Sequence, residues 1–390
     1  MDVAAALARA VELARRGTFA VEPNPRVGAV LLDARGELVA EGHHAHWGGP
    51  HAEVVALQAA GARARGATLC VTLEPCSTRG KTPACTDALL SAGISRVVAG
   101  CRDPNPAHAG RGLDALRAAG LDVVEASDPE CLALLPRFTA HLARQATAPD
   151  RQSAQAGGRP PPSPARPWVL AKWAMSRDGA IAPPGGGPAP ISGEASRIWL
   201  HRVRAHLDAI VVGVGTVLAD DPDLTARGDE AAVRPLRRVV LDPDLRTPLG
   251  CRLVATAGQT ATWIFTTEDA DEQPQSVLEN EGARVVRIPG GDDWLSGVLG
   301  ALHLSGVGRL MVEGGATTLG GFLGVGLVDQ VAVLRGPRDL GPGALPALPG
   351  RRLGGLEPAA LAAALGLHEV DVRRLGDDLL VQGFTRAAAD

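Results

Sequence analysis

Four residues in the first hundred of the chain have the types and the spacing of a hydrolytic metal site. His51 and Glu53 are separated by one alanine, and Cys76 and Cys85 follow them in the sequence. One imidazole and two thiolates suit Zn²⁺, which lowers the pKa of a bound water to about 7 when one coordination position stays open. Glu53 has the carboxylate that such a site needs to carry protons without binding the metal. The sequence therefore predicts a zinc site with His51, Cys76 and Cys85 as ligands and Glu53 as the catalytic proton carrier.

The same pattern is similar to the signature of zinc-dependent deaminases, in which H-x-E is followed by P-C-x-x-C. Pro75 and Cys76 match the start of its second half, but eight residues separate Cys76 from Cys85. We therefore expect hydrolysis of an amine from a ring carbon. A structural zinc with four protein ligands is the alternative, and a histidine from the 43–46 segment could supply the fourth ligand.

A second group of candidate residues lies in the other half of the chain. Residues 313–321 read EGGATTLGG and follow an apolar run that predicts a strand. Glycines let backbone N–H groups approach a ligand, and the N-terminus of the helix expected to follow favours an anion. The segment is thus a candidate site for a nucleotide phosphate, with a plain tight turn as the alternative. Lys172, Arg204 and Arg227 are candidate partners of a substrate phosphate.

The elements that must position these residues alternate between strand and helix. In the first half we expect strands at 27–32, 38–42, 68–73, 96–99 and 122–124, and helices at 3–16, 51–60, 84–92, 112–119 and 129–144. In the second half we expect strands at 168–174, 209–214, 238–242, 262–266, 284–288 and 309–313, helices at 194–205 and 293–303, and added antiparallel strands at 330–334, 368–372 and 379–384. This alternation predicts an α/β fold in both halves, with a three-layer α/β/α sandwich in the first.

Length and composition bound the organisation of the chain. Its 390 residues suffice for two domains. Residues 147–166, rich in Pro, Gly and Ser, predict an extended linker between a first domain at 1–146 and a second at 167–390.

Charge and hydropathy narrow the expected partners and location. The net charge is −4 and no block of Lys or Arg stands out, which argues against a broad nucleic-acid surface. No apolar run reaches the roughly 20 residues of a membrane span. Residues 1–16 look like an amphipathic helix rather than a signal peptide, and the six cysteines are too sparse for a disulfide framework. We therefore expect a cytoplasmic enzyme.

Several segments resemble the family of bifunctional riboflavin-biosynthesis deaminase–reductases. In the first half these are residues 24–28 (NPRVG), 50–53 (PHAE), 72–77 (TLEPCS), 80–85 (GKTPAC), 103–106 (DPNP) and 110–112 (GRG). In the second half they are residues 176–179 (SRDG), 216–222 (TVLADDP) and the glycine segment that begins at Glu313. The likeness covers nearly the whole chain outside the linker, and the long spacing from Cys76 to Cys85 is itself a mark of this family.

The resemblance implies two successive reactions. A first domain with a cytidine-deaminase-like fold would use Zn²⁺ to deaminate 2,5-diamino-6-(5-phosphoribosylamino)pyrimidin-4(3H)-one. A second domain with a dihydrofolate-reductase-like fold would use NADPH to reduce the ribose of the resulting 5-amino-6-(5-phosphoribosylamino)uracil. The expected partner is this small phosphoribosylated pyrimidine, with no nucleic acid and no membrane, and a homo-oligomer is left open.

The resemblance also assigns contacts residue by residue. It places the NADPH contacts on Ala174, Ser176, Thr216, Asp220, Gly315, Ala316, Thr317, Thr318, Leu319, Gly320 and Gly321. It places the substrate contacts on Asn24, Lys172, Arg204, Leu224, Arg227 and Glu313.

The chain departs from the family pattern at three places. Thr78 and Arg79 stand where the family usually has two histidines, residues 183–190 read PPGGGPAP where it tends to have a segment with a tryptophan, and residues 335–340 are less apolar than usual. These departures motivate an alternative, a related pyrimidine deaminase with an altered or weak reductase domain. A nucleic-acid base deaminase and a non-enzymatic protein with structural zinc are the other hypotheses.

Overall fold

The computed structural model of the chain divides into two compact units, the first formed by residues 1–146. It describes residues 1–17, 19–78, 83–146, 166–187, 189–227 and 235–386, so the linker expected at 147–166 lies almost wholly outside the described residues. Within these ranges, no helix has the length and apolar character needed to cross a membrane. Each unit is described by itself.

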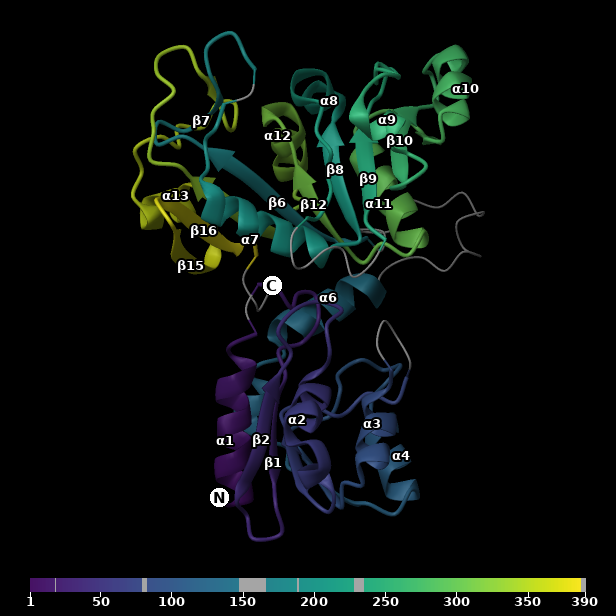
Figure 1. Cartoon of the computed structure of the whole chain (residues 1–390), viewed down its shortest axis with the longest axis vertical. Helices are drawn as coiled ribbons and strands as arrows, with labels where there is room; N and C mark the ends of the chain where they lie inside the picture. Colours follow the sequence, from purple (N-terminus) through teal and green to yellow (C-terminus); the bar gives the residue numbers. More distant parts are fainter. Residues whose placement is uncertain (18, 79–82, 147–165, 188, 228–234, 387–390) are drawn as a thin grey trace. The chain divides into compact units, whose positions relative to one another are not determined.

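The first unit is a five-stranded sheet between two layers of helices (Figure 1). Its strands are β1 (Gly28–Leu32), β2 (Leu38–His43), β3 (Thr68–Val71), β4 (Arg96–Ala99) and β5 (Asp122–Glu125). Its helices are α1 (Val3–Ala14), α2 (Ala52–Ala60), α3 (Cys85–Ala92), α4 (Arg111–Ala118), α5 (Pro129–Leu132) and α6 (Pro136–Ala146), with a 3₁₀ turn η1 at Gly61–Ala64.

The order of this sheet is β2-β1-β3-β4-β5. Strand β1 is antiparallel to both of its neighbours, whereas β3, β4 and β5 run parallel. Helices α1 and α2 both pack on β1 from opposite faces, which explains why all five residues of β1 are buried and apolar or small. The parallel arrangement brings the loops after β3 and β4 to the same edge of the sheet.

The second unit is built on a nine-stranded sheet with helices on both faces (Figure 1). Its strands are β6 (Trp168–Met175), β8 (Ala209–Gly213), β9 (Arg237–Leu241), β10 (Thr262–Thr267), β11 (Arg284–Ile288), β12 (Arg309–Glu313), β13 (Gln330–Arg335), β15 (His368–Leu375) and β16 (Asp378–Phe384), and β7 (Ala180–Ala182) pairs with β14 (Leu345–Pro346) in a small separate sheet. Its helices are α7 (Glu194–Ala205), α8 (Val214–Asp220), α9 (Arg252–Ala255), α10 (Glu272–Asn280), α11 (Trp294–Leu304), α12 (Ala316–Gly324) and α13 (Pro358–Ala364).

The nine strands run in the order β11-β10-β9-β8-β12-β6-β13-β16-β15, and those from β11 to β13 are parallel. Alternate residues of a strand enter different cores. On β6, Ala171 and Trp173 face the core that holds α11, α12 and α13, while Leu170 faces the core that holds α7 to α10. This alternation with period two is what a strand covered on both faces requires.

The structure confirms the α/β class and the position of every strand and helix expected from the sequence to within a few residues. Two expectations are wrong in detail. The helix expected at 129–144 is split into α5 and α6, because Pro136 has no N–H to continue the first helix and its ring clashes with the preceding turn. The strand at 330–335 is antiparallel only to β16, since its other edge is parallel to β6.

Candidate functional site

The predicted metal ligands come from two adjacent helix starts and one turn of the first unit. His51 is the N-cap of α2, and Glu53 lies in the first turn of that helix. Cys76 follows the end of β3, and Cys85 is the first residue of α3. Helices α2 and α3 pack against each other, so the four side chains meet at one end of the sheet.

The geometry of this cluster fits a zinc ion. The donor atoms of His51, Cys76 and Cys85 all lie within 4.8 Å of one another. His51 Nδ1 is 3.1 Å from Cys85 Sγ and 3.6 Å from Cys76 Sγ. The contacts with Cys85 and with His51 lower the pKa of the Cys76 thiol well below its ordinary value, which favours the thiolate that a metal requires. In the part of the chain that the structure describes, this is the one group of three or more His, Cys, Asp or Glu residues placed to bind a metal.

Glu53 lies beside the cluster and is almost fully buried, with 3% of its surface exposed. Burial raises the pKa of its carboxyl above the ordinary value, against the lowering effect of His51. A carboxyl with a raised pKa can accept and return a proton near neutral pH. The position therefore suits the proton carrier that the sequence predicts.

His44 is buried near His51, and hydrogen bonds engage both of its ring nitrogens. Nδ1 lies 3.0 Å from the Pro50 carbonyl, which can only accept, so Nδ1 is assigned the proton. Nε2 then accepts from the Asn24 side-chain amide at 3.0 Å. Burial lowers the pKa of His44 to about 4, consistent with this neutral form. His44 thus orients Asn24 and does not act as the fourth ligand of a structural zinc.

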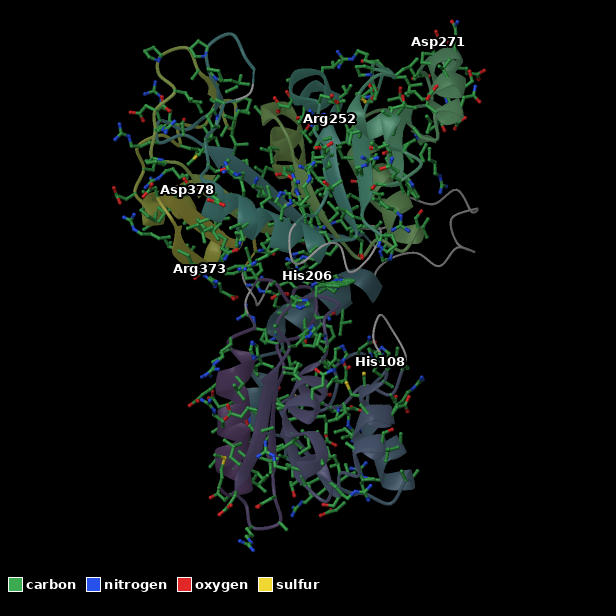
Figure 2. The ribbon with its side chains drawn as sticks, in the orientation of Figure 1. His108, His206, Arg252, Asp271, Arg373 and Asp378 are labelled. Atoms are coloured by element: carbon green, nitrogen blue, oxygen red, sulfur yellow. The ribbon has the colours of Figure 1, made fainter. Side chains whose placement is uncertain are left out.

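These residues line one cavity of about 340 Å³. Asn24, His51, Glu53 and Cys76 form one part of its wall. Another part comes from the loop after β4 and contains Asp103, Asn105 and His108, the last of which is labelled in Figure 2. The volume lies in the range of small-molecule sites.

Asp103 and Asn105 belong to a segment that carries the family resemblance, whereas His108 does not, and none of the three was predicted to be a site residue. A DPNP segment directly after a predicted strand could have indicated them, because loops at the carboxyl end of parallel strands carry ligand contacts. His108 Nδ1 lies 3.5 Å from the hydroxyl of Thr78, one of the two positions at which the chain departs from the family histidines. The other, Arg79, lies outside the described residues.

In the second unit the predicted substrate residues Lys172, Arg204 and Glu313 come together. Lys172 on β6 is the register partner of Glu313 on β12, and its Nζ donates to Oε1 at 2.9 Å. Arg204 of α7 donates to Oε2 through Nη2 at 2.6 Å and through Nε at 3.2 Å. Burial would raise the pKa of Glu313, but the two cations outweigh it and lower the pKa to about 2.

The predicted residues Leu224 and Arg227 lie on a segment next to this triad. Arg204 Nη1 donates to the Thr225 carbonyl at 3.1 Å, which ties the segment to Glu313. Leu224 is buried and has a φ of 49°. Arg227 is exposed and pairs with Asp223 on the same segment. The structure therefore brings four of the five second-unit substrate candidates together and directs the guanidinium of Arg227 elsewhere.

The predicted cofactor segment begins at the end of β12. Gly315 is the N-cap of α12, and its N–H donates to the Thr216 hydroxyl of α8 at 3.1 Å. Strands β8 and β12 are neighbours, so the N-termini of α8 and α12 lie side by side. Gly213 allows this approach, since a Cβ there would lie 2.3 Å from Thr318 Oγ1. Residues 316–321 lie in α12 and Asp220 ends α8, so the two helices carry most of the predicted NADPH contacts.

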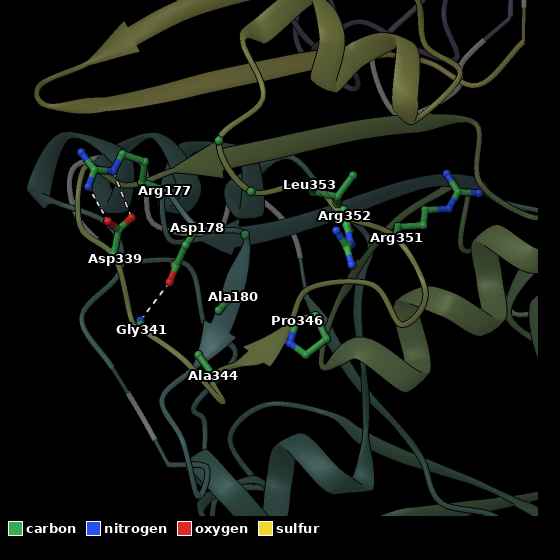
Figure 3. Close-up of a pocket in the computed structure, with 13 residues that line it drawn as sticks. Arg177, Asp178, Ala180, Asp339, Gly341, Ala344, Pro346, Arg351, Arg352 and Leu353 are labelled. Carbon is green, nitrogen blue, oxygen red and sulfur yellow. Dashed lines mark hydrogen bonds and ion pairs between the residues drawn. The ribbon is translucent and has the colours of Figure 1, made fainter.

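The other two predicted NADPH contacts, Ala174 and Ser176, lie at the end of β6, far in sequence from α8 and α12. The Ser176 hydroxyl is used within its own turn, where it receives the N–H of Ala180 at 2.9 Å and bonds to Asp178. The turn borders a cavity of about 570 Å³ that contains none of the predicted site residues. Figure 3 shows its wall, with Arg177 on Asp339 and the Asp178 carboxylate facing the Gly341 N–H.

Comparison with known proteins covers both units. Residues 2–101 match the family model described as cytidine and deoxycytidylate deaminase zinc-binding region. Residues 167–381 match the family model described as RibD C-terminal domain. The first match contains all four residues of the predicted zinc centre, and the second contains every predicted residue of the reductase.

The chain is also similar to whole proteins along nearly its full length. It is 35% identical to the riboflavin biosynthesis protein RibD of Aquifex aeolicus over 95% of each chain, and 38% identical to that of Escherichia coli over 96% of each. A solved structure of Acinetobacter baumannii RibD is 30% identical, covers 98% of each chain and has a TM-score of 0.66. A diaminohydroxyphosphoribosylaminopyrimidine deaminase/5-amino-6-(5-phosphoribosylamino)uracil reductase from Thermotoga maritima is 31% identical over 97% of each chain, with a TM-score of 0.63.

Proposed function

The chain belongs to the RibD family, the bifunctional deaminase–reductases of riboflavin biosynthesis, and we propose which of its own residues carry the two reactions. The deaminase unit uses zinc and the reductase unit uses NADPH. The observation that carries our assignment is the close approach of His51, Cys76 and Cys85 beside buried Glu53, in a cavity of the size of a small ligand.

In the deaminase unit, His51, Cys76 and Cys85 would hold the zinc. When bound with an open position, zinc supplies a water acidic enough to attack the amine-bearing ring carbon near neutral pH. The Glu53 carboxyl would carry a proton from the attacking water to the departing nitrogen, and its burial and raised pKa suit that role. Asn24, held by neutral His44, presents its remaining amide groups to the substrate in the same cavity.

In the reductase unit, Lys172, Arg204 and Glu313 would hold the substrate, together with Leu224 and Arg227. The ion pairs of Glu313 with Lys172 and Arg204 fix these three side chains before the substrate arrives, which lowers the ordering cost of binding. The N-termini of α8 and α12 would receive the phosphates of NADPH, since backbone N–H groups and the helix dipole favour an anion there. When bound, NADPH would supply the hydride, and the residues named above would hold the substrate for its transfer.

We also infer which partners this chain binds. The residues above bind a small phosphoribosylated pyrimidine, and neither nucleic acid nor a membrane is needed as a partner. The cytoplasmic location stays a prediction from the sequence.

The test replaces the proton carrier and follows both activities of the same protein. Glu53→Gln keeps the size of the side chain and removes its ability to take a proton. We expect ammonia release from the diaminopyrimidine ribotide to fall by about 10²- to 10⁴-fold, the usual contribution of a positioned acid–base group. Bound zinc should stay at the wild-type level, and NADPH oxidation with the purified deaminated intermediate should be unchanged.

Two controls make the result specific. Cys85→Ala should lose both zinc and ammonia release while NADPH oxidation persists, which separates the metal ligand from the proton carrier. Cys70→Ala changes a buried cysteine of β3 outside the cluster and should keep both zinc and ammonia release. Ammonia release by Glu53→Gln at the wild-type rate would refute the assigned role of Glu53.

A further inference from the structure

Glu74 is a buried carboxylate that the assigned reactions do not use. It lies between β3 and the metal ligand Cys76, and 5% of its surface is exposed. Among the described residues, its hydrogen-bond donors are all backbone N–H groups and none is a cation. Burying a carboxylate that receives no hydrogen bond from a cation is costly, so its contacts must explain its placement.

One carboxylate oxygen of Glu74 binds both ends of a loop. Oε2 accepts from the N–H of Asp103 at 3.1 Å and from the N–H of Gly110 at 2.9 Å, the two ends of the loop after β4. Within the loop, the Asp103 carboxylate accepts from the Asn105 N–H at 2.8 Å. His108 N also donates to the Asn105 carbonyl at 2.8 Å. The loop is therefore ordered by its own bonds and fastened to the unit by Glu74.

The other carboxylate oxygen of Glu74 caps helix α4. Oε1 accepts from the N–H groups of Gly112 at 2.8 Å and Leu113 at 3.4 Å, which belong to the first turn of α4. The N-cap residue Gly110 has no side chain to fill this role. An anion at this place satisfies two donors that the helix leaves free and also faces the positive end of its dipole.

Close packing holds α4 against the turn that carries the metal ligand. A Cβ on Gly112 would lie 1.8 Å from the Pro75 carbonyl oxygen, so glycine is the residue that fits there. Glu74, Pro75 and Cys76 are consecutive, and the helix start therefore lies directly on the segment that presents Cys76. The same segment thus borders both the metal cluster and the 103–110 loop.

The loop fastened by Glu74 and the segment that carries Cys76 both line the deaminase cavity. Cys76 lies on one part of its wall and Asp103, Asn105 and His108 on another, with Glu74 itself in the lining. We propose that Glu74 is a positioning residue of the deaminase, whose carboxylate fixes the 103–110 loop against the Cys76 turn and so sets the binding of the substrate. This inference rests on the proposed function of the cavity and adds a specificity element to it.

The test separates positioning from mere folding by comparing KM with kcat. Glu74→Gln keeps the shape of the side chain but replaces one carboxylate oxygen by an NH₂ group. Either the loop donors Asp103 and Gly110 or the α4 donors Gly112 and Leu113 then lose their acceptor. We expect KM of the diaminopyrimidine ribotide for ammonia release to rise about 10- to 100-fold, as for other small displacements of a binding group. We expect kcat per bound zinc to change by less than about threefold, because losing binding that is equal in the ground state and the transition state raises KM and leaves kcat unchanged.

A purely structural role gives a different result. Partial unfolding would lower bound zinc and the maximal rate together and would leave KM of the remaining enzyme unchanged, which would overturn the proposal. Glu74→Asp shortens the side chain by one methylene and should raise KM less than Glu74→Gln. If Glu74→Gln does not yield folded protein, the same comparison is made with Glu74→Asp, and an unchanged KM there would also overturn it.

Two further measurements complete the design. Glu130→Gln removes an exposed carboxylate of α5 that pairs with Arg15 outside the cavity, and it should leave both KM and kcat unchanged. NADPH oxidation with the deaminated intermediate reports the state of the other unit in every variant. If the proposed function fails, Glu53→Gln will release ammonia at the wild-type rate. If only the present inference fails, Glu53→Gln will still lose ammonia release, and KM of the Glu74 variants will equal that of wild type.

Discussion

The ionisation of Glu313 makes the free energy of unfolding of the second unit depend on pH in the acid range. Its pKa in the folded protein is about 2, below the ordinary value of 4.5. Between these pH values the unfolded chain binds the proton and the folded chain does not, so the contribution of Glu313 to stability is complete above pH 4.5 and is lost as pH falls toward 2. A shift of this size corresponds to about 3 kcal/mol.

We therefore expect Glu313→Gln to destabilise the second unit most at neutral pH. The change leaves Lys172 and Arg204 without their anion, which should lower the free energy of unfolding by roughly 3–5 kcal/mol. The difference from wild type should shrink as pH falls from 4.5 to 2. Denaturant unfolding followed by tryptophan fluorescence measures it, since every tryptophan except Trp47 lies in the second unit.

Asp339→Asn is the matched control for this measurement. Asp339 pairs with Arg177, but the two side chains are 42% and 63% exposed. Solvent screens such pairs, so the free energy of unfolding should change by less than about 1 kcal/mol. A destabilisation by Glu313→Gln that is the same at pH 7 and pH 3 would contradict the role assigned to its charge.

At the level of single residues, the sequence predicts the metal ligands because their chemistry resides in their own side chains. His51, Cys76 and Cys85 are residue types that bind zinc in almost any order, and the structure brings them together. Glu74 could not be found in this way. Its partners are backbone N–H groups 29 to 39 positions further along the chain, and a backbone group has no sequence signature.

At the level of elements, the packing of α1 on β1 depends on one glycine. A Cβ on Gly28 would lie 2.0 Å from the Ala10 carbonyl oxygen and 2.8 Å from the Ala14 nitrogen. We expect Gly28→Ala to force α1 away from the strand and to cost about 1–3 kcal/mol or more, as overpacking does. The temperature at which ammonia release is lost should fall by several degrees, while that for NADPH oxidation should not.

Gly300→Ala provides the opposite case. Gly300 lies within α11, and a Cβ there has no neighbour within 4 Å. Alanine favours the helix by up to about 1 kcal/mol, so the temperature at which NADPH oxidation is lost should stay equal or rise. Equal effects of the two substitutions on ammonia release would show that the contact of α1 with β1 is not tight.

The elements that the sequence analysis missed have physical reasons for being missed. Helix α10 contains Pro274 in its first turn. The N–H groups of a first turn have no acceptor within the helix, so proline is tolerated there, but its presence in the sequence obscures the helical pattern. Helix α8 has seven residues, which is too short for a clear periodicity, and it is followed by its C-cap residue Asp221 with a φ of 40°. The direction of β13 could not be read at all, because an apolar run is the same whether its neighbours are parallel or antiparallel.

At the level of the whole molecule, each unit has the parts of an independent domain. One apolar core extends from Ala6 to Leu135, and two others lie on the faces of the second sheet between Val169 and Val381. Among the described residues, none of these cores contains residues of both units. The composition of the linker predicted this division, whereas the size and strand order of the second sheet depend on contacts between residues far apart in sequence.

Separate cores lead to the expectation that the two activities survive a break between them. A protease site placed within residues 147–165 would allow the purified, zinc-loaded chain to be cut once. Because each core is buried by contacts of its own unit, we expect ammonia release and NADPH oxidation, each measured at saturating substrate, to stay within about twofold of the uncut protein. The rate of the coupled reaction at low substrate is measured on the same samples. If the coupled rate falls after cleavage while the two separate rates hold, the deaminated intermediate normally passes between tethered units. If either separate rate is lost, the units are not independent and the division at residues 146 and 167 is wrong.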